Sequence, residues 1–466
     1  MSGRMGEVEL VEQAGDAAAG PPDDGLAARR SRVLRLARRW WPVPVLALAG
    51  VVAWQHASDA REQERVERLR ATAGVLAETV TEPLEAREWG TPDTVEALLS
   101  GVGTVDGLAV GVVHPTTRRV DLVALDPATG EEAWRITLAD QSDEPWGPGV
   151  RCGRSVGATL WCTVDEAVQR DADAATARTR LVEVDLAARS VAGTRDLPDG
   201  ATAAVVGDLL AVAAASPEGV AVEGADAASG SPRWRTVLEG AGPAPWLGEE
   251  DGRLLVWGAS GAWLLDPADG RVQAEGDGLA VADGQVLDWE GSGVRLLGTD
   301  GRGTARADGT PVGVWPDDGS AGGLLVLRLG DGTPQGRVRA VDPGSGEVAW
   351  ERALPQDGTS GLVLLDGVLY GAGGTAVWAV DAATGAEVWT AEGERSDASG
   401  TGLLTDGVAL LRAERAAGDG DRMLAAYRLT DGRRLWSAPL PEDVVTLWTQ
   451  HGRLFGQEGS AVYAIG

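Results

Sequence analysis

One motif recurs along most of this 466-residue chain, and the repetition constrains the fold more than any other feature. Three close copies read VALDPATGEEAW (123–134), VRAVDPGSGEVAW (338–350) and VWAVDAATGAEVW (377–389). Each copy has an Asp, a Gly four residues later and a Trp four residues after the Gly. Self-similarity at a steady period is typical of repeat architectures, in which each repeat forms one supersecondary unit.

Looser copies extend the repeat from about residue 100 to residue 466. The positions equivalent to the Asp are 126, 185, 226, 266, 300, 342, 381, 428 and 466. Dipeptides such as Asp366-Gly367 precede apolar runs at the same interval, and such pairs favour tight hairpins because both residues adopt positive φ. In the DxxTG turn, the Asp accepts backbone hydrogen bonds and the Gly takes a left-handed conformation. Each unit therefore predicts four antiparallel strands, which is the composition of a propeller blade.

The repeat resembles the pyrroloquinoline-quinone-like (PQQ-like) propeller repeat, whose unit has the form (L/V)xALDxxTGxxxW. The resemblance covers nearly all of residues 100–466 and implies an all-β, PQQ-like β-propeller of four-stranded blades. Nine repeat positions leave eight or nine blades open; eight is usual for the family, and we expect eight. The last copy lacks a Trp strand, so a segment near Trp89 could close the ring. In the family the repeated Trp docks each blade on its neighbour, which gives this structural role to Trp134, Trp234, Trp350, Trp389 and Trp436.

The region before the repeats has the pattern of an export signal. Residues 1–39 predict a disordered, cytoplasmic tail that ends in six arginines between Arg29 and Arg39. The run from Trp40 to His56 carries no Asp, Glu, Lys or Arg, so we predict a transmembrane signal anchor over 40–57. A cleaved signal peptide, with a small-residue site near Ala49, is the alternative. Both interpretations place the repeats outside the cytoplasm, and the first predicts a single-pass protein of the cell membrane.

A helical stalk is predicted over residues 58–88, between the anchor and the propeller at 89–466. Val66, Leu69, Ala73, Leu76 and Val80 follow a heptad spacing, and Pro83 is expected to end the helix. Two heptads are too few to require a coiled coil, so we expect a helix that rests on the next domain.

Cys152 and Cys162 are the two cysteines of the chain, and they flank a predicted turn. Outside the cytoplasm, this spacing favours a disulfide between adjacent strands. Two free buried thiols, or a metal pair without a nearby His, are the alternatives.

Composition weighs against two classes of function. The 41 basic and 70 acidic residues give a net charge of −29, which disfavours nucleic-acid binding. The resemblance implies that enzymes of the family hold the quinone and calcium through adjacent cysteines, carboxylates and Asn, with a catalytic Asp. This chain has no adjacent cysteines and no Asn. We therefore assign no catalytic, cofactor-binding or metal-binding residues and expect no cofactor.

The lack of Lys as well as Asn indicates a G+C-rich, bacterial coding sequence.

Two functions from different classes remain as hypotheses. The first is a membrane-tethered propeller that binds or organises a cell-envelope protein or another surface ligand without catalysis. The second is a PQQ- and calcium-dependent oxidoreductase that uses the same ring. A third, an outer-membrane assembly scaffold like the lipoprotein propellers, shares the fold but lacks support because no lipobox cysteine follows the apolar run.

Overall fold

The structure of the chain is a computed structural model. It describes residues 42–116, 119–140, 149–153, 158–171, 174–198, 200–242, 245–250, 252–282, 285–298, 303–330, 336–353, 361–397, 402–416, 420–442, 444–459 and 461–466. The chain divides into two compact units, Met1–Arg65 and Val66–Gly466. The predicted tail at 1–39 lies outside the described residues. All described residues of the first unit belong to helix α2 (Pro42–Arg70). No helix of the described ranges is both long enough and apolar enough to cross a membrane.

The segment predicted as a stalk differs from the expectation. The helix does not begin near residue 58 and ends at Arg70, well before Pro83. Gly74 has a φ of 91°, and the following segment runs along the propeller, where the Leu76 N–H donates to the carbonyl of Thr405 at 2.9 Å. Leu76 and Val80 are buried there in a cluster with blade residues, so the heptad positions serve packing on the propeller. The second unit accordingly begins at Val66.

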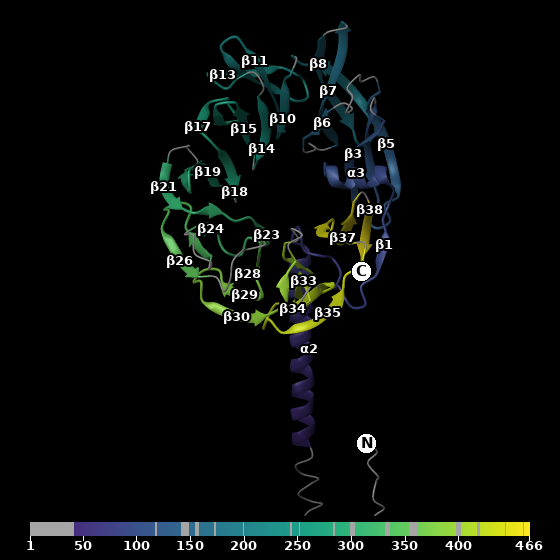
Figure 1. The fold of residues 1–466 in the computed structure, drawn as a ribbon, viewed down its shortest axis with the longest axis vertical. Helices are drawn as coiled ribbons and strands as arrows, with labels where there is room; N and C mark the ends of the chain where they lie inside the picture. The colour runs from purple at the N-terminus through teal and green to yellow at the C-terminus, as the bar shows by residue number, and fades with distance from the viewer. Residues whose placement is uncertain are drawn as a thin grey trace, which may run out of the picture. The chain divides into compact units, whose positions relative to one another are not determined.

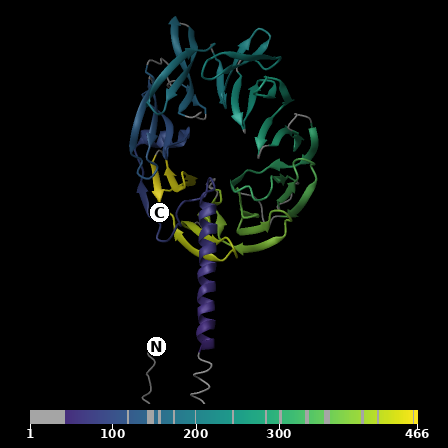
Figure 2. The same cartoon turned by 180° about the vertical axis from the view of Figure 1, so that it is seen from behind.

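Nine sheets make up the second unit among the described residues, and Figures 1 and 2 show them arranged in a ring. The first copy of the repeat and the last belong to different sheets, so the blade number is nine and the expectation of eight was wrong. We number the blades along the chain. Blades 1 to 3 contain β2 (Gly103–Val105), β3 (Leu108–Thr116), β4 (Arg119–Leu125) and β5 (Glu132–Ala139); β6 (Gly149–Cys152), β7 (Thr159–Asp171), β8 (Ala174–Asp185) and β9 (Ser190–Asp196); and β10 (Thr202–Val206), β11 (Leu209–Ser216), β12 (Gly219–Asp226) and β13 (Pro232–Leu238).

The next blades follow the same order, with one exchange of strands. Blades 4 to 6 contain β14 (Trp246–Glu250), β15 (Arg253–Gly258), β16 (Gly261–Leu265) and β17 (Val272–Gly276); β18 (Leu279–Ala282), β19 (Gln285–Glu290), β20 (Gly293–Leu297) and β21 (Gly303–Asp308); and β22 (Thr310–Pro311), β24 (Leu325–Leu329), β25 (Arg337–Val341) and β26 (Val348–Ala353). Strand β23 (Val314–Asp317) leaves blade 6 and pairs in parallel with β27 of blade 7.

The last three blades complete the ring. Blades 7 to 9 contain β27 (Leu362–Leu365), β28 (Val368–Gly373), β29 (Ala376–Asp381) and β30 (Glu387–Glu392); β31 (Arg395–Ser396), β32 (Leu404–Thr405), β33 (Ala409–Arg415), β34 (Arg422–Arg428) and β35 (Arg434–Pro439); and β36 (Thr446–Gln450), β37 (Arg453–Glu458) and β38 (Ala461–Ile465) with β1 (Ala86–Glu88). Strand β1 pairs antiparallel with β38, so the segment just before Trp89 supplies the missing strand as predicted. A short helix, α3 (Pro92–Ser100), then leads into blade 1.

The core lies between the blades. Each hydrophobic cluster joins two neighbouring blades, and the nine clusters together cover all nine interfaces of the ring. The cluster that joins blades 9 and 1 contains Trp89, Phe455 and Val123. Because this interface is packed like the others, the ring is closed.

The turns have the backbone conformations that the sequence predicts. The Gly of the DxxTG turn has a φ of 68–73° in six copies, from Gly130 to Gly432. Asp366-Gly367 and His451-Gly452 have positive φ at both residues. Asp406-Gly407 differs because only the glycine is left-handed; the buried Asp406 carboxylate instead accepts the N–H groups of Val408 and Ala409.

The repeated tryptophans lie against the turn of the following blade. The indole N–H of Trp234, Trp350 and Trp389 donates to the carbonyls of Pro267, Ala382 and Leu429, at 2.7–2.9 Å. The rings cover the turn glycine: a Cβ on Gly270, Gly385 or Gly432 would lie within 2.3–2.7 Å of the indole. The turn therefore needs Gly for its φ and also for the space that the Trp occupies.

The other two docking candidates, Trp134 and Trp436, differ from each other in burial. Trp134 is buried between blades 1 and 2, whereas Trp436 is only partly buried between blades 8 and 9. Trp89 also reaches a turn, because its indole N–H donates to the carbonyl of Pro127 in blade 1 at 3.3 Å. The energetic role of all these tryptophans stays a prediction.

Candidate functional site

The first strand of each blade lies nearest the middle of the ring, as Figure 1 shows for β10, β14 and β18. Such an inner strand pairs with its own blade along one edge, so its other edge is the place where the ring could bind something. In an antiparallel pair, the backbone groups of alternate residues point toward the partner strand and those of the others point away. The register therefore decides which residues present their N–H and C=O groups at this inner edge.

One cavity among the described residues lies against three of these strands. It measures about 480 Å³, within the usual range of ligand pockets. Its walls come from α3, β3 and the inner strands of blades 2, 3 and 4. The lining residues are Glu96, Ser100, Gly101, Val102, Val112, His114, Val150, Arg151, Cys152, Gly153, Ala203, Ala204, Val205, Trp246, Leu247, Gly248 and Glu249.

The cavity contains open strand edges. In β10 the two-residue turn makes Val206 and Leu209 a hydrogen-bonded pair, so Ala203 and Val205 face the inner edge. The same argument places Leu247 at the inner edge of β14. In β6 the Gly153 N–H bonds to the carbonyl of Trp161, so Val150 and Cys152 face the edge. All five of these residues line the cavity, and no strand of the described chain pairs with these three edges.

Other inner edges are covered by groups of the same chain. In blade 1 the three-residue β2 leaves part of β3 unpaired, and there the N–H groups of Val112 and His114 donate to Ser100 Oγ at 2.6 Å and Glu96 Oε2 at 3.1 Å, both on α3. In blade 5 the N–H of Val281 donates to Glu250 Oε2 at 3.1 Å. In blade 7 the whole edge of β27 pairs with β23. In blade 8 the carbonyl of Thr405 accepts the Leu76 N–H.

Helix α3 forms one wall because local sequence and packing fix it. Thr91 caps its N-terminus in a reciprocal capping box with Thr94, and Pro92 occupies the first turn, where proline fits best. Gly111 lets the helix lie directly on β3, since a Cβ there would lie 1.7 Å from the carbonyl oxygen of Ala97. The helix thereby presents Glu96 and Ser100 to the cavity.

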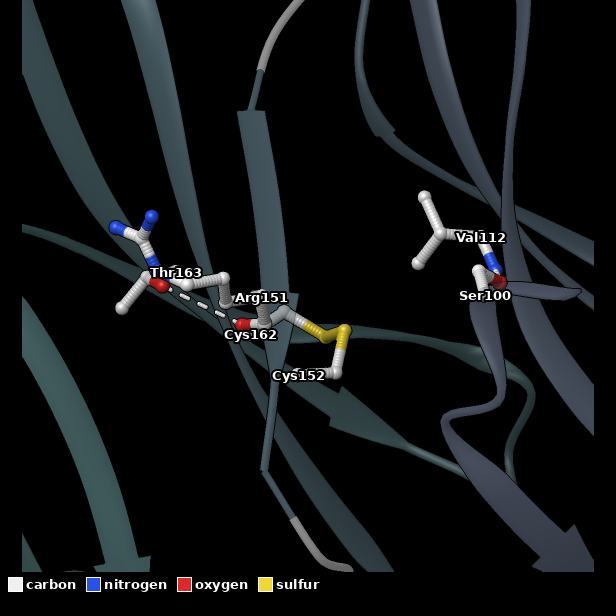
Figure 3. Close-up of a disulfide and its surroundings, with 6 residues drawn as sticks. All are labelled: Ser100, Val112, Arg151, Cys152, Cys162 and Thr163. Carbon is white, nitrogen blue, oxygen red and sulfur yellow. Dashed lines mark hydrogen bonds between the residues drawn. A yellow bond between two sulfur atoms is a disulfide. The ribbon is translucent and has the colours of Figure 1, made fainter. Parts of the chain in front are cut away.

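The predicted disulfide forms part of the opposite wall. Cys152 and Cys162 are bonded and lie directly opposite each other in the β6–β7 register. Figure 3 shows the sulfur atoms on the side of β6 toward Ser100 and Val112. Cys162 is fully buried, whereas Cys152 is half-buried and lines the cavity. Because β6 has only four residues, this bond holds a short wall of the cavity to its blade.

The charged groups of the cavity have partners within the protein. Glu96 Oε1 lies 2.6 Å from His114 Nδ1, and Arg151 forms an ion pair with Asp165 at 2.8 Å. Glu249 Oε1 accepts the N–H of Gly252 at 2.8 Å. The rest of the lining is backbone, small or aliphatic side chains, and Trp246, which is 44% exposed. The Trp246 ring lies over Gly248 and 4.3 Å from the ring of Trp257, centroid to centroid.

The structure brings one predicted pair of site residues into this cavity and places the others elsewhere. The disulfide is at the cavity, and the five docking candidates lie in the interfaces between blades. Sequence reasoning missed α3, Trp246 and the open edges. Thr91-Pro92-Asp93 is a recognisable helix start that could have revealed α3. No comparable signal is present in the strands β10 (TAAVV) and β14 (WLGEE), because whether a strand edge is open depends on which other parts of the chain pair with it.

The donor set gives little support for a calcium–quinone site. Calcium binds six to eight oxygen ligands, and the described residues contain no group of three or more His, Cys, Asp or Glu side chains placed to hold a metal ion. The two cavity carboxylates, Glu96 and Glu249, are already engaged as above. Quinone and calcium binding therefore stay predictions of the alternative hypothesis.

Comparison with known proteins gives a partial match. The family model described as outer membrane protein assembly factor BamB matches residues 291–465, less than half of the chain. No curated protein matches. Among solved structures, BamB from Moraxella catarrhalis is 16% identical, with 83% of this chain and 98% of that chain covered and a TM-score of 0.38. Quinohemoprotein alcohol dehydrogenase from Comamonas testosteroni is 14% identical, with 82% and 76% covered and a TM-score of 0.37. At these values the structural matches carry no argument about function.

Proposed function

We propose that this protein is an exported, non-enzymatic propeller that binds a segment of a cell-envelope protein in the cavity between α3 and blades 2, 3 and 4. The observation that carries the proposal is the coincidence of the cavity with the open edges of β6, β10 and β14. Open strand edges are ready sites for pairing with another chain, and proteins that do not use them usually cover them. The exposed Trp246 adds the kind of aromatic anchor that binding sites favour.

Two further observations support the proposal. The family model that matches residues 291–465 is described as an outer membrane protein assembly factor, which is a role in handling other proteins. The disulfide agrees with a compartment outside the reducing cytoplasm. We therefore propose a single-pass membrane location with residues 1–39 in the cytoplasm, residues 40–57 as the anchor and the propeller outside.

The binding site is tested by photo-crosslinking in the native envelope. A photoreactive amino acid at Trp246 should give a discrete crosslinked partner, whereas the same group at Arg235, exposed on an outer strand, should not. Ala203→Arg, which places a large charged side chain in the cavity, should abolish the crosslink at Trp246, with Ala203→Ser as control. A crosslink that persists in Ala203→Arg would show that the partner binds elsewhere.

The location is tested separately. Protease added to intact cells with permeable outer layers should degrade the propeller and leave a protected fragment that contains residues 1–39. A protected propeller, or a mature protein that begins after residue 49, would contradict the membrane-tethered form.

The same purified chain tests the oxidoreductase alternative. We expect titration with PQQ and calcium to give no saturable absorbance change. Stoichiometric quinone binding together with dye-linked oxidation of an alcohol or sugar would overturn the non-enzymatic proposal.

A further inference from the structure

We propose that the bound segment is an extended stretch of polypeptide that adds as a strand to the open inner edges in the cavity. This inference rests on the proposed function and specifies how its site recognises a partner. Main-chain hydrogen bonds would supply most of the binding, and small side-chain subsites would supply the selectivity.

The first step concerns the backbone. Val150, Cys152, Ala203, Val205 and Leu247 direct their N–H and C=O groups toward the cavity rather than into their own blades. Each N–H and C=O is a strong hydrogen-bonding group, and an extended chain presents complementary groups at the same spacing. A compact small molecule would match few of them, whereas a strand of about five residues would match the length of β10 or β14.

The second step compares the edges of different blades. Helix α3, Glu250 and β23 make direct hydrogen bonds to edge-facing groups of β3, β18 and β27, in blades 1, 5 and 7. The edges of β6, β10 and β14 are adjacent and surround one cavity. Edge-facing groups of blades 1, 5, 7 and 8 bind groups of the same chain, so three neighbouring edges without such a partner among the described residues favour a place for another chain.

The third step concerns the side chains. Arg151 is paired with Asp165, whereas Glu96 and Glu249 are held by His114 and the Gly252 N–H and remain carboxylates. Ala203, Ala204, Val205 and Val150 provide shallow apolar contacts, and Trp246 provides one large flat surface. These apolar surfaces fit small or apolar side chains, with an apolar or aromatic residue placed against Trp246.

The test uses the full chain purified in detergent and a phage library of random linear peptides. Peptides enriched on the wild-type protein but not on Ala203→Arg are synthesised, and each backbone amide is methylated in turn. Strand addition predicts an alternating pattern: methylation of every second amide should weaken binding about threefold to tenfold per lost hydrogen bond, and methylation of the others should have little effect.

Two variants of the protein test strand addition by removing hydrogen-bond donors of the protein instead of the peptide. Ala203→Pro and Val150→Pro remove an edge-facing N–H without removing a hydrogen bond of the blade, and each should weaken the peptide by a similar factor. Ala203→Ser and Val150→Ala are the matched controls that keep the N–H. Thermal melts identify any proline variant that fails to fold, in which case the methylation pattern alone decides.

The outcomes separate the two proposals. Peptides that require the cavity but show no alternation would overturn strand addition and leave the proposed binding site intact. Peptides that bind Ala203→Arg as well as wild type, or a library without enriched peptides, would overturn both.

Discussion

Blades 2 to 4 and blades 7 to 9 are built from the same repeat but differ in whether other parts of the chain bind at their inner strands. In blades 2 to 4 the inner strands border a cavity and their edges are open. In blades 7 and 8 the chain fills the corresponding places, because β23 covers β27 and the Leu76 N–H binds the carbonyl of Thr405. In blade 9 the Ala77 N–H binds the carbonyl of Gly452, in the turn after the inner strand β36. One side of the ring therefore has inner edges bound by the same chain, whereas the described residues provide no such partners for the inner edges of the other side.

The closed side also buries charge. Glu414 is fully buried in blade 8, where Tyr427 Oη donates to its Oε1 at 2.6 Å and Arg434 lies 3.3 Å from its Oε2. Arg412, only 2% exposed, lies 3.5 Å from the same carboxylate. Burial and the hydrogen bond to Glu414 raise the pKa of Tyr427, which keeps the phenol protonated as the donor. Such a network holds only while every member is present.

The largest effect should come from the docking tryptophans of the closed side. Trp350→Ala and Trp389→Ala should each lower the free energy of unfolding by roughly 3–5 kcal/mol, because each removes a buried aromatic ring and its hydrogen bond to the next blade. Thermal and denaturant unfolding measure the change. Unchanged unfolding of both variants would refute the docking role.

Loss of the buried carboxylate should be the next largest effect. Glu414→Ala leaves Arg412 buried without its counter-charge and should cost about 3 kcal/mol or more of stability. Glu223→Ala is the matched control, since Glu223 forms an ion pair with Arg235 at the exposed surface. Similar unfolding curves for the two variants would show that blade 8 does not depend on its buried network.

On the open side, removal of the disulfide should have a smaller and more local effect. The double variant Cys152→Ser/Cys162→Ser opens a loop with a sequence separation of 10 and should cost about 2–3 kcal/mol. Hydrogen exchange should rise first at β6 and β7, while blades 7 to 9 keep their protection. Two free thiols in unreduced, denatured wild-type protein would contradict the bond itself.

Trp246→Ala should separate binding from stability. The ring is 44% exposed, so its loss should change the unfolding free energy by less than about 1 kcal/mol. Peptides selected on the cavity should nevertheless lose about tenfold in affinity, as expected for an aromatic anchor. A stability loss equal to that of Trp389→Ala would show that the two sides of the ring do not differ in this way.

Acid sensitivity should be the smallest effect and should not distinguish the two sides. Hydrogen bonds from the backbone and hydroxyl of Ser229, with Arg233, lower the pKa of Asp226 to about 2, and turn hydrogen bonds also lower the pKa values of Asp342 and Asp381. A carboxyl with a lowered pKa in the folded state stabilises above its ordinary pKa, and this contribution is lost as pH falls from about 4 toward 2. Melting temperatures of wild type and Asp226→Asn, followed over this range, should converge as pH falls.

The blades could be predicted from the sequence because the fold requires particular residues at fixed positions of each repeat. Gly270, Gly385 and Gly432 are fixed both by left-handed backbone and by the Trp that covers them, so the spacing of Asp, Gly and Trp survives in the sequence. The blade number was harder, because the incomplete last copy could share a blade with the first or form its own. Pairing of β1 with β38 decides this, and it depends on contact between distant parts of the chain.

The cavity could not be predicted in the same way. An edge is open when no other part of the chain pairs with it. Where an edge does have a partner, as β18 has Glu250 and β27 has β23, that partner comes from another blade. The early end of α2 also depends on distant parts of the chain, because Leu69, Val75 and Leu76 are buried against residues of blades 7 to 9. The disulfide was predictable because ten residues around a turn place two cysteines opposite each other.

Closure of the ring through β1 has a consequence for the timing of folding. Strand β1 is synthesised before any blade, yet its partner β38 is the last strand of the ring. Until β38 emerges, Trp89 and the face of blade 1 that receives it lack the covering of blade 9, and every partial ring exposes an apolar blade surface. Contacts between such distant segments form slowly, and exposed surfaces of this kind invite aggregation. The chain should therefore reach its stable form in one late step, after all nine blades are present, and should be most vulnerable to proteases and misfolding before it.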